Sequence, residues 1–323
     1  MPIKAMIDGI WHPAIEDSPA LRARRVAEKT ASFSGRVTAG GRSGYPPAAG
    51  RYHLYASYAC PWAHRTILYR ALMGLEAAVP MSVVDPRWGG PDGWTFAAAD
   101  DPDSGVTRDH VNGFDYLYEV YRLAKPDVTA KVTVPVLFDR ETETIVSNES
   151  GDIIRMFGDA FADFATRDTD FRPHRLRPAI DALNGFVLER ICMGVYRAGF
   201  ADDQAAYDTA VGDLFDALDS VEARLADRPY LHGEVVTETD WHLFATLVRF
   251  DAVYYGALKC NLHRLVDYPH LWAHTRRLYT LPGVADTVRL DHVKRHYYDD
   301  LGMTNPTIVP AGPPVDFSAA AAV

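Results

Sequence analysis

The chain of 323 residues is long enough for about two domains, and its 48% apolar and 24% charged residues are typical of globular proteins. Its 33 basic and 43 acidic residues give a net charge of −10, which argues against nucleic acid or an anionic membrane as the main partner, because both need a basic surface. Three cysteines cannot build a disulfide framework, and no apolar run approaches the roughly 18 residues of a membrane span. With no apolar leader at its start, the sequence predicts a protein of the reducing cytoplasm.

Composition along the chain predicts four parts. Residues 1–50 are first Arg-rich and then rich in Gly and Pro, which predicts a long, loop-like extension. Residues 51–165 mix strand and helix patterns, whereas residues 170–300 are almost purely helical. Residues 301–323 contain four prolines and end in Ala-Ala-Ala-Ala-Val, so we expect a tail with little regular structure.

The order of elements in the first part predicts its fold. A β-favouring run over 52–57 is followed by apolar residues at helical spacing over 62–75, then by a short strand over 79–84. After a long connection come a helix near 111–124, an antiparallel hairpin of 132–139 with 144–147, and a helix that begins near 150. This order is typical of a thioredoxin-like α/β domain.

The second part shows helical periodicity over 180–195, 203–225, 240–255 and 268–280, which predicts an all-α domain. Thr237 and Asp240 flank the start of one of these helices as in a capping box, with Asp in place of Glu. We interpret this motif as structural.

Cys60 lies where the first predicted strand gives way to a helix. The N–H groups of a helix start carry partial positive charge, which stabilises a thiolate and lowers the pKa of the thiol. Ala63 stands where a dithiol motif would have its second cysteine, so Cys60 cannot close a local disulfide. If Cys60 forms a mixed disulfide, a thiol from solution must then resolve it. In a cytoplasm that thiol is glutathione. The alternative is a buried, inert cysteine, which is the interpretation we favour for Cys192 and Cys260.

Val134-Pro135 begins a predicted strand, where proline is out of place because it has no N–H to donate. A cis peptide bond at this point would leave the backbone of Val134 exposed to pair with a peptide ligand. An ordinary trans proline on an edge strand is the alternative.

Glu149 and Ser150 open a predicted helix. The helix start and the Ser150 hydroxyl suit a carboxylate, and Glu149 suits an ammonium. A γ-glutamyl group carries both charges on one carbon, although simple helix capping also explains the pattern. His292 and His296 are four residues apart, but no third ligand accompanies them, so we expect a solvated or salt-bridged helix face and no metal.

Together these features resemble a glutathione transferase of the xi class, the S-glutathionyl-hydroquinone reductases. The resemblance covers about residues 50–300, and the long N-terminal arm also fits that class. Six segments carry the resemblance: 58–66 (YACPWAHRT), 93–96 (GWTF), 131–137 (KVTVPVL), 146–150 (VSNES), 194–201 (GVYRAGFA) and 294–298 (KRHYY).

The resemblance implies a role for individual residues. Cys60 would be the nucleophile, and glutathione would be held by Trp94, Lys131, Val134, Glu149 and Ser150. Tyr196 and Tyr297 would meet the hydroquinone ring, because a phenol can both stack on a ring and hydrogen-bond its hydroxyls. Tyr298 competes with Tyr297 for this role. From the sequence alone, Tyr196 and Tyr297 each also suit a half-buried core position.

The activity implied is glutathione-dependent reduction of S-glutathionyl-hydroquinones through a Cys60–glutathione mixed disulfide, with release of oxidised glutathione. Glutathione is then a co-substrate, and neither a metal nor a nucleotide is needed. We expect a cytoplasmic homodimer that binds no nucleic acid and no membrane. Two alternatives stay open: an omega-like thioltransferase or dehydroascorbate reductase, and a non-catalytic transferase-like scaffold.

Overall fold

The computed structural model describes residues 3–88, 90–300 and 308–318, and the chain divides into two units, Met1–Asp168 and Thr169–Val323. The first unit contains a four-stranded sheet in the order β4-β3-β5-β6. β3 (Tyr52–Ala56) pairs in parallel with β4 (Met81–Val83) and antiparallel with β5 (Val136–Asp139), which in turn pairs antiparallel with β6 (Thr144–Ser147). This is the predicted thioredoxin-like arrangement.

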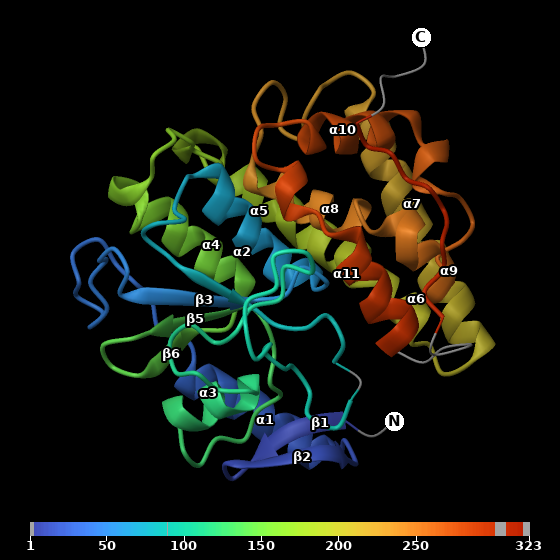
Figure 1. The fold of residues 1–323 in the computed structure, drawn as a ribbon. Helices are drawn as coiled ribbons and strands as arrows, with labels where there is room; N and C mark the ends of the chain where they lie inside the picture. The colour runs from blue at the N-terminus through green and yellow to red at the C-terminus, as the bar shows by residue number, and fades with distance from the viewer. Residues whose placement is uncertain (1–2, 89, 301–307, 319–323) are drawn as a thin grey trace. The chain divides into compact units, whose positions relative to one another are not determined.

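Helices cover both faces of this sheet. α2 (Pro61–Leu72) and α4 (Ser150–Asp159) pack side by side on one face, and α3 (Leu117–Ala124) lies on the other (Figure 1). A short 3-10 turn, η1 (Ala162–Phe164), follows α4. The strand predicted over 132–139 begins only at Val136, because Pro135 has no N–H for the ladder. The Val134–Pro135 peptide bond is cis, as the sequence suggested.

The prediction of a loop-like arm over residues 1–50 was wrong for its first part. β1 (Ile3–Ile7) and β2 (Ile10–Ile15) form a hairpin, and α1 (Pro19–Ser32) follows. The two-residue turn is Asp8-Gly9, with φ of 49° and 77°, a conformation that Asp-Gly favours in a type I′ hairpin. This dipeptide between two apolar runs was the signal that the composition obscured.

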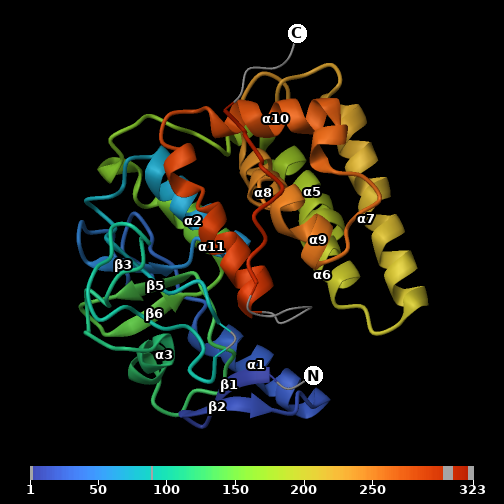
Figure 2. The ribbon, with the colours of Figure 1, turned by 45° about the vertical axis from the view of Figure 1, so that its right-hand side comes forward.

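The second unit is built of helices joined by loops, and no strand is named among its described residues, as predicted (Figure 2). Its principal helices are α5 (Arg177–Phe186), α6 (Gly194–Gly199), α7 (Gln204–Leu225), α8 (Glu238–Leu247), α10 (Pro269–Tyr279) and α11 (Leu290–Lys294). Three π-helical segments interrupt or extend them: η3 (Val187–Cys192), η4 (Phe250–Tyr254), which leads into the short α9 (Tyr255–Ala257), and η7 (Arg295–Asp300). The remaining 3-10 turns are η2 (His174–Leu176), η5 (Leu265–Asp267) and η6 (Ala285–Thr287).

The capping box at the start of α8 is present as predicted. The backbone N–H and the hydroxyl of Thr237 both donate to Asp240, over 2.8 and 2.7 Å. Asp240 also accepts from the Leu231 N–H and from His274 Nε2, each at 2.9 Å, and it is fully buried. These donors hold the pKa of Asp240 below its usual range against the opposing effect of burial. The motif therefore anchors both the helix and a buried polar network.

The part of the tail that is described, residues 308–318, has no helix or strand but is fastened to the second unit (Figure 2). The Phe317 ring packs against Trp272 and Tyr279 of α10, and Lys294 donates to the carbonyls of residues 310–312. Residues 301–307 and 319–323, also part of the predicted tail, lie outside the described residues. Within the described ranges, none of the helices has the length and apolarity needed to cross a membrane.

Candidate functional site

Cys60 is the residue that caps the N-terminus of α2. Its backbone is extended (φ −77°, ψ 122°), its carbonyl accepts from the His64 N–H at 2.9 Å, and Pro61 fills the first helical position. β3 ends four residues earlier, so the sheet and the helix together fix the place of the thiol. Cys60 is partly exposed, whereas most of α2 is buried. A partly exposed sulfur at the positive end of a helix dipole is suited to act as a thiolate nucleophile.

The cation nearest in sequence to Cys60 is Arg65, on the next turn of α2. Its guanidinium lies 4.4 Å from the centre of the Trp62 ring, and the residue is only 2% exposed. Trp62 therefore serves to pack this buried cation, and the first two turns of α2 carry only positive charge. Both features favour an anion at the helix start.

Val134 faces Cys60, as the sequence predicted for the proline turn. The Cys60 Sγ lies 3.7 Å from the Val134 carbonyl oxygen. The adjoining Thr133 exchanges two hydrogen bonds with the phenol of Tyr121, which donates to the Thr133 carbonyl at 2.9 Å and accepts from its N–H at 3.2 Å. The same phenol accepts from the Asn148 side chain at 3.0 Å.

The Tyr121 hydroxyl thus hydrogen-bonds to two separate segments, a role that sequence analysis missed. It is fully buried in α3 and connects the Val134 turn with the residue that precedes Glu149 and Ser150. No motif marks it, because an aromatic residue on the buried face of a helix is ordinary core. Only the fold shows that its hydroxyl joins two predicted ligand-binding segments.

Glu149 and Ser150 occupy the start of α4. Glu149 is the N-cap, its N–H donates to Ser147 Oγ at 3.1 Å, and its side chain is exposed. Ser150 is 2% exposed at the first helical position. The pair therefore presents an exposed carboxylate beside the positive end of a helix, which are the two charges that an α-amino acid group requires.

Trp94 and Lys131 are contributed by two connecting segments of the same unit. The Trp94 carbonyl accepts from the Leu117 N–H at 3.0 Å, which ties its loop to the start of α3, and its ring lies 6.5 Å from that of Trp88. The Lys131 ammonium lies 5.3 Å from the Trp88 ring. Desolvation of the ammonium lowers the pKa of Lys131, and Arg25 adds to the effect, whereas Asp17 and Cys60 oppose it. Lys131 and Cys60 thus share one electrostatic environment, although the lysine itself reaches solvent.

In the second unit, Tyr196 and Tyr297 are brought together. Their hydroxyls are 2.6 Å apart, and the Tyr297 hydroxyl also lies 3.4 Å from that of Tyr254. Tyr297 is 1% exposed, so burial raises its pKa well above the usual value, whereas Tyr196 is partly exposed. Tyr196 is therefore the phenol of this cluster that an incoming ring can reach, with Tyr297 behind it.

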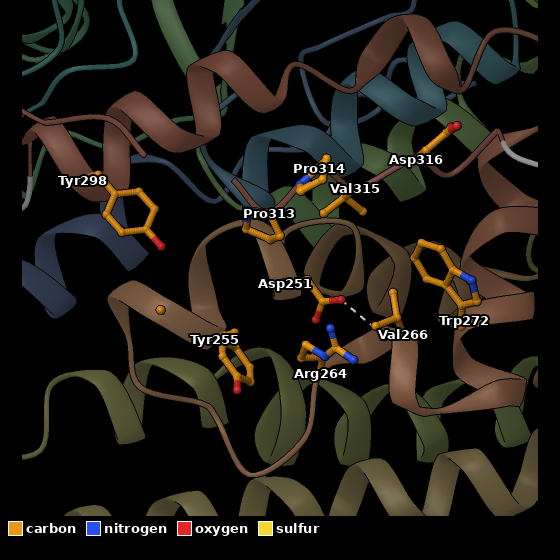
Figure 3. Close-up of a pocket in the computed structure, with 11 residues that line it drawn as sticks. Asp251, Tyr255, Arg264, Val266, Trp272, Tyr298, Pro313, Pro314, Val315 and Asp316 are labelled. Carbon is orange, nitrogen blue, oxygen red and sulfur yellow. Dashed lines mark hydrogen bonds between the residues drawn. The ribbon is translucent and has the colours of Figure 1, made fainter. Parts of the chain in front are cut away.

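Tyr298 lies outside the cluster formed by Tyr196, Tyr254 and Tyr297. It lines a cavity of about 550 Å³ with Tyr255, Arg264, Trp272 and the tail residues Pro313 and Val315 (Figure 3). Of the two competing tyrosines, only Tyr297 bonds to Tyr196.

The other cysteines and the histidine pair behave mostly as expected. Cys192 and Cys260 are buried, and burial raises the pKa of the Cys260 thiol to about 12. Cys260 lies in a loop after α9. The expectation of a solvated face was wrong for His292, which is fully buried in α11. Among the described residues no group of three or more His, Cys, Asp or Glu side chains could hold a metal ion.

Comparison with known proteins gives matches over nearly the whole chain. Residues 59–160 match the family model "Glutathione S-transferase, N-terminal domain", and residues 204–277 match "Glutathione S-transferase, C-terminal domain". The glutathionyl-hydroquinone reductase PcpF of Sphingobium chlorophenolicum is 46% identical over 309 residues, which are 95% of this chain and 96% of that protein.

Two solved structures are similarly close. A xi-class glutathione transferase from Natrialba magadii aligns with a TM-score of 0.91 and 44% identity, covering 99% of this chain and 96% of that one. The glutathione-bound structure of YqjG, a glutathione transferase homologue from Escherichia coli, aligns with a TM-score of 0.87 and 41% identity over 98% and 97% of the two chains.

Proposed function

Because the chain belongs to the xi class of the glutathione S-transferases, we propose that it is a glutathionyl-hydroquinone reductase with Cys60 as its nucleophile. The observation that carries the proposal is the place of Cys60: a partly exposed thiol at the N-terminus of α2, 3.7 Å from the Val134 carbonyl. The activity is the one named for the 46%-identical relative.

In the first step the Cys60 thiolate attacks the sulfur of the glutathionyl-hydroquinone. A disulfide forms between Cys60 and glutathione while the bond between sulfur and ring carbon breaks. The electron pair of that bond goes to the ring carbon, which takes a proton, and the hydroquinone leaves. The helix start alone gives only a few-fold gain in attack, because a thiolate of lower pKa is also a weaker nucleophile. Holding the substrate sulfur in line with Cys60 supplies most of the rate.

In the second step the thiolate of a second glutathione attacks the mixed disulfide. Oxidised glutathione leaves, and the Cys60 thiolate is restored. Ala63 is the reason that a second molecule is needed, since no resolving thiol stands one turn along α2. The two steps together convert one conjugate and one glutathione into one hydroquinone and one oxidised glutathione.

The first unit holds the glutathionyl part. The Val134 backbone pairs with the cysteinyl residue of glutathione as a short added strand. Ser150 and the start of α4 bind the γ-glutamyl carboxylate, and Glu149 binds its ammonium. Trp94 and Lys131 contact the remainder of the tripeptide. The Tyr121 hydrogen bonds support this arrangement, because they fix the Val134 turn relative to the start of α4.

The second unit holds the aromatic part. Tyr196 donates a hydrogen bond to a ring hydroxyl, and Tyr297 holds the Tyr196 hydroxyl in place through their 2.6 Å contact. Burial raises the pKa of Tyr297 well above its usual value, so this phenol is a hydrogen-bond donor and not a base at neutral pH.

Glutathione is accordingly a co-substrate of this chain, and the reaction requires neither metal nor nucleotide. We further propose that the protein works as a homodimer in the cytoplasm, where reduced glutathione is abundant. Sedimentation velocity tests the first statement through the mass of the particle, and cell fractionation tests the second.

The activity is tested by incubating the protein with glutathione and a glutathionyl-hydroquinone and measuring both products by liquid chromatography. We expect equal amounts of hydroquinone and oxidised glutathione. Cys60→Ser should release neither, because a serine hydroxyl is far too weakly acidic to replace the thiolate. Cys192→Ser, which removes a buried thiol of the second unit, is the matched control and should retain activity. Release of hydroquinone by Cys60→Ser would refute the mechanism.

A further inference from the structure

The tail forms the roof of a cavity in the second unit. Pro313 and its neighbours lie over a space of about 550 Å³, and Asp251 of η4 lies on its floor (Figure 3). Lys294 holds the tail before this roof through the carbonyls of residues 310–312, and the Phe317 ring holds it after the roof against α10. The roof is therefore fixed on both sides by the folded chain, so the cavity is formed before any ligand arrives.

The size and the walls of the cavity are those of a small-molecule site. Protein interiors leave few gaps larger than a water molecule, whereas ligand sites have volumes of about 300–1,000 Å³ and are lined mainly by apolar and aromatic groups. Trp272 and Tyr298 lie at opposite ends of the cavity in Figure 3, and Val266 and Val315 add aliphatic surface. Flat and apolar walls of this kind suit an aromatic ring.

Asp251 places a buried carboxylate on the floor of the cavity. The residue is 7% exposed, and its two oxygens accept from the Leu265 and Val266 N–H groups at 2.5 and 3.3 Å. Each carboxylate oxygen has a second lone pair, so Asp251 can accept a further hydrogen bond from inside the cavity. Burial raises the pKa of Asp251, whereas the two N–H groups and Arg264 oppose this shift, so a further donor would stabilise the charged form.

The charges that face the cavity disfavour a charged ligand. The Arg264 guanidinium lies beside the Asp251 carboxylate, and two of its nitrogens donate to Asp267 at 3.2 and 2.7 Å (Figure 3). Asp316 also lines the cavity, but its carboxylate points away in Figure 3 and accepts from Ser318 at 2.8 and 2.6 Å. An anion would therefore meet Asp251 and a cation would meet Arg264, whereas a neutral hydroxyl can donate to the carboxylate without either repulsion.

We propose that this cavity is a second binding site of the protein and takes a neutral hydroxyaromatic molecule. The hydroxyl of the ligand donates to Asp251, and its ring lies between Trp272 and Tyr298 beneath the tail. Gly256 leaves room for the Tyr298 hydroxyl, because a Cβ at this glycine would come within 2.5 Å of it. None of the described lining residues is among those assigned to glutathione or to the hydroquinone ring, so the inference does not depend on the proposed reductase activity.

The test measures the binding of naphthalene probes to the full-length protein by equilibrium dialysis at pH 7. The phenol 2-naphthol is neutral and carries a hydroxyl donor, and 2-methoxynaphthalene has the same ring without a donor. The anion 2-naphthoate and the cation 2-naphthylmethylammonium test the preference for a neutral ligand.

Two variants change the cavity. Asp251→Asn keeps an acceptor for the backbone N–H groups but removes the charge, and Val266→Phe fills part of the space. Val235→Phe is the matched control, because Val266 and Val235 are 38% and 36% exposed and only Val266 lines the cavity.

We expect the wild type to bind 2-naphthol about tenfold more tightly than the methoxy compound or either charged probe. Asp251→Asn should reduce the preference for the hydroxyl to about threefold or less. Val266→Phe should weaken the binding of both neutral probes about tenfold, and Val235→Phe should match the wild type.

Binding of 2-naphthol that survives Val266→Phe unchanged would place the probe elsewhere and overturn the inference. No binding of any probe, or tighter binding of a charged probe, would also overturn it. A parallel loss of hydroquinone release in Val266→Phe would make the cavity part of the reductase site and would refute the claim of a second site. Circular dichroism checks that Asp251→Asn folds, and if it does not, Val266→Phe decides the question because its side chain is partly exposed.

Discussion

His53 is a buried titratable group in the strand that leads to Cys60, so we predict that it makes the stability of the protein depend on pH. The residue is 1% exposed in β3, its Nε2 lies 2.8 Å from the Ser82 hydroxyl, and its ring packs edge-on against Tyr55. Burial lowers the pKa of His53 from 6.5 to about 3, and the nearby His110 and Arg140 add smaller effects in the same direction. The folded protein therefore keeps this imidazole neutral down to acid pH.

The size of the effect on stability follows from the two pKa values. In the unfolded chain His53 takes up a proton near pH 6.5, whereas in the folded chain it does so only near pH 3. The unfolded state thus binds more protons between these values, and stability falls as the pH falls. At pH 5 the solution is about 1.5 pH units below the unfolded-state pKa of His53 and still above its folded-state pKa. This difference corresponds to a loss of about 2 kcal/mol in the free energy of unfolding relative to pH 7 or above.

The assay is urea unfolding of the wild type and His53→Gln at pH 7 and pH 5. Glutamine places an amide near Ser82 but does not titrate. We expect the wild type to lose about 2 kcal/mol more than His53→Gln between the two pH values. His270→Gln, at an exposed position of α10, should follow the wild type. If His53→Gln shows the same pH dependence as the wild type, the assignment of acid sensitivity to His53 is refuted.

Three further predictions concern the chemistry and the second unit. Ala63→Cys places a second thiol one turn after the nucleophile, so turnover should depend less on the second glutathione; an unchanged dependence in steady-state kinetics would contradict this. Tyr196→Phe and Tyr297→Phe should each slow hydroquinone release about twofold to tenfold, non-additively, and spare reduction of a small disulfide. Tyr298→Phe is the control for this pair, and parallel loss of both activities would make the tyrosines structural. Thr237→Ala should lower the free energy of unfolding by about 1–3 kcal/mol in urea titrations, and a loss near zero would show that the capping box is dispensable.

Much of the fold could be predicted because its signals are local. The helix after Cys60, the strand hairpin before Glu149 and the capping box at Thr237 each depend on a few neighbouring residues, and all three are confirmed. The xi-class resemblance is confirmed as well, since similar sequences match nearly the whole chain.

The sequence predictions failed in two situations. In one, the surrounding composition hid a local turn motif; in the others, the outcome depended on tertiary contacts that no local pattern reveals. The Asp8-Gly9 turn was hidden by the Arg-rich and Gly/Pro-rich composition around it, so the hairpin and α1 were missed. His292 looked like a surface residue because helical spacing alone does not say which face is buried. The Tyr121 hydroxyl joins Thr133 to Asn148 only after the fold brings them together.

The roles of the predicted site residues stay predictions. Within the first unit the structure brings Cys60 to Val134, and within the second it brings Tyr196 to Tyr297, which supports their assignment. The homodimer and the cytoplasmic location are likewise predictions.

The most direct test of the central claim is to trap the mixed disulfide. The reduced protein is mixed with an equimolar amount of a glutathionyl-hydroquinone and no free glutathione, then quenched with acid and analysed by intact-protein and peptide mass spectrometry. We expect one glutathione on Cys60, none on Cys192 or Cys260, and one hydroquinone released for each adduct. Hydroquinone released without an adduct on Cys60, or an adduct on another cysteine, would contradict the mechanism.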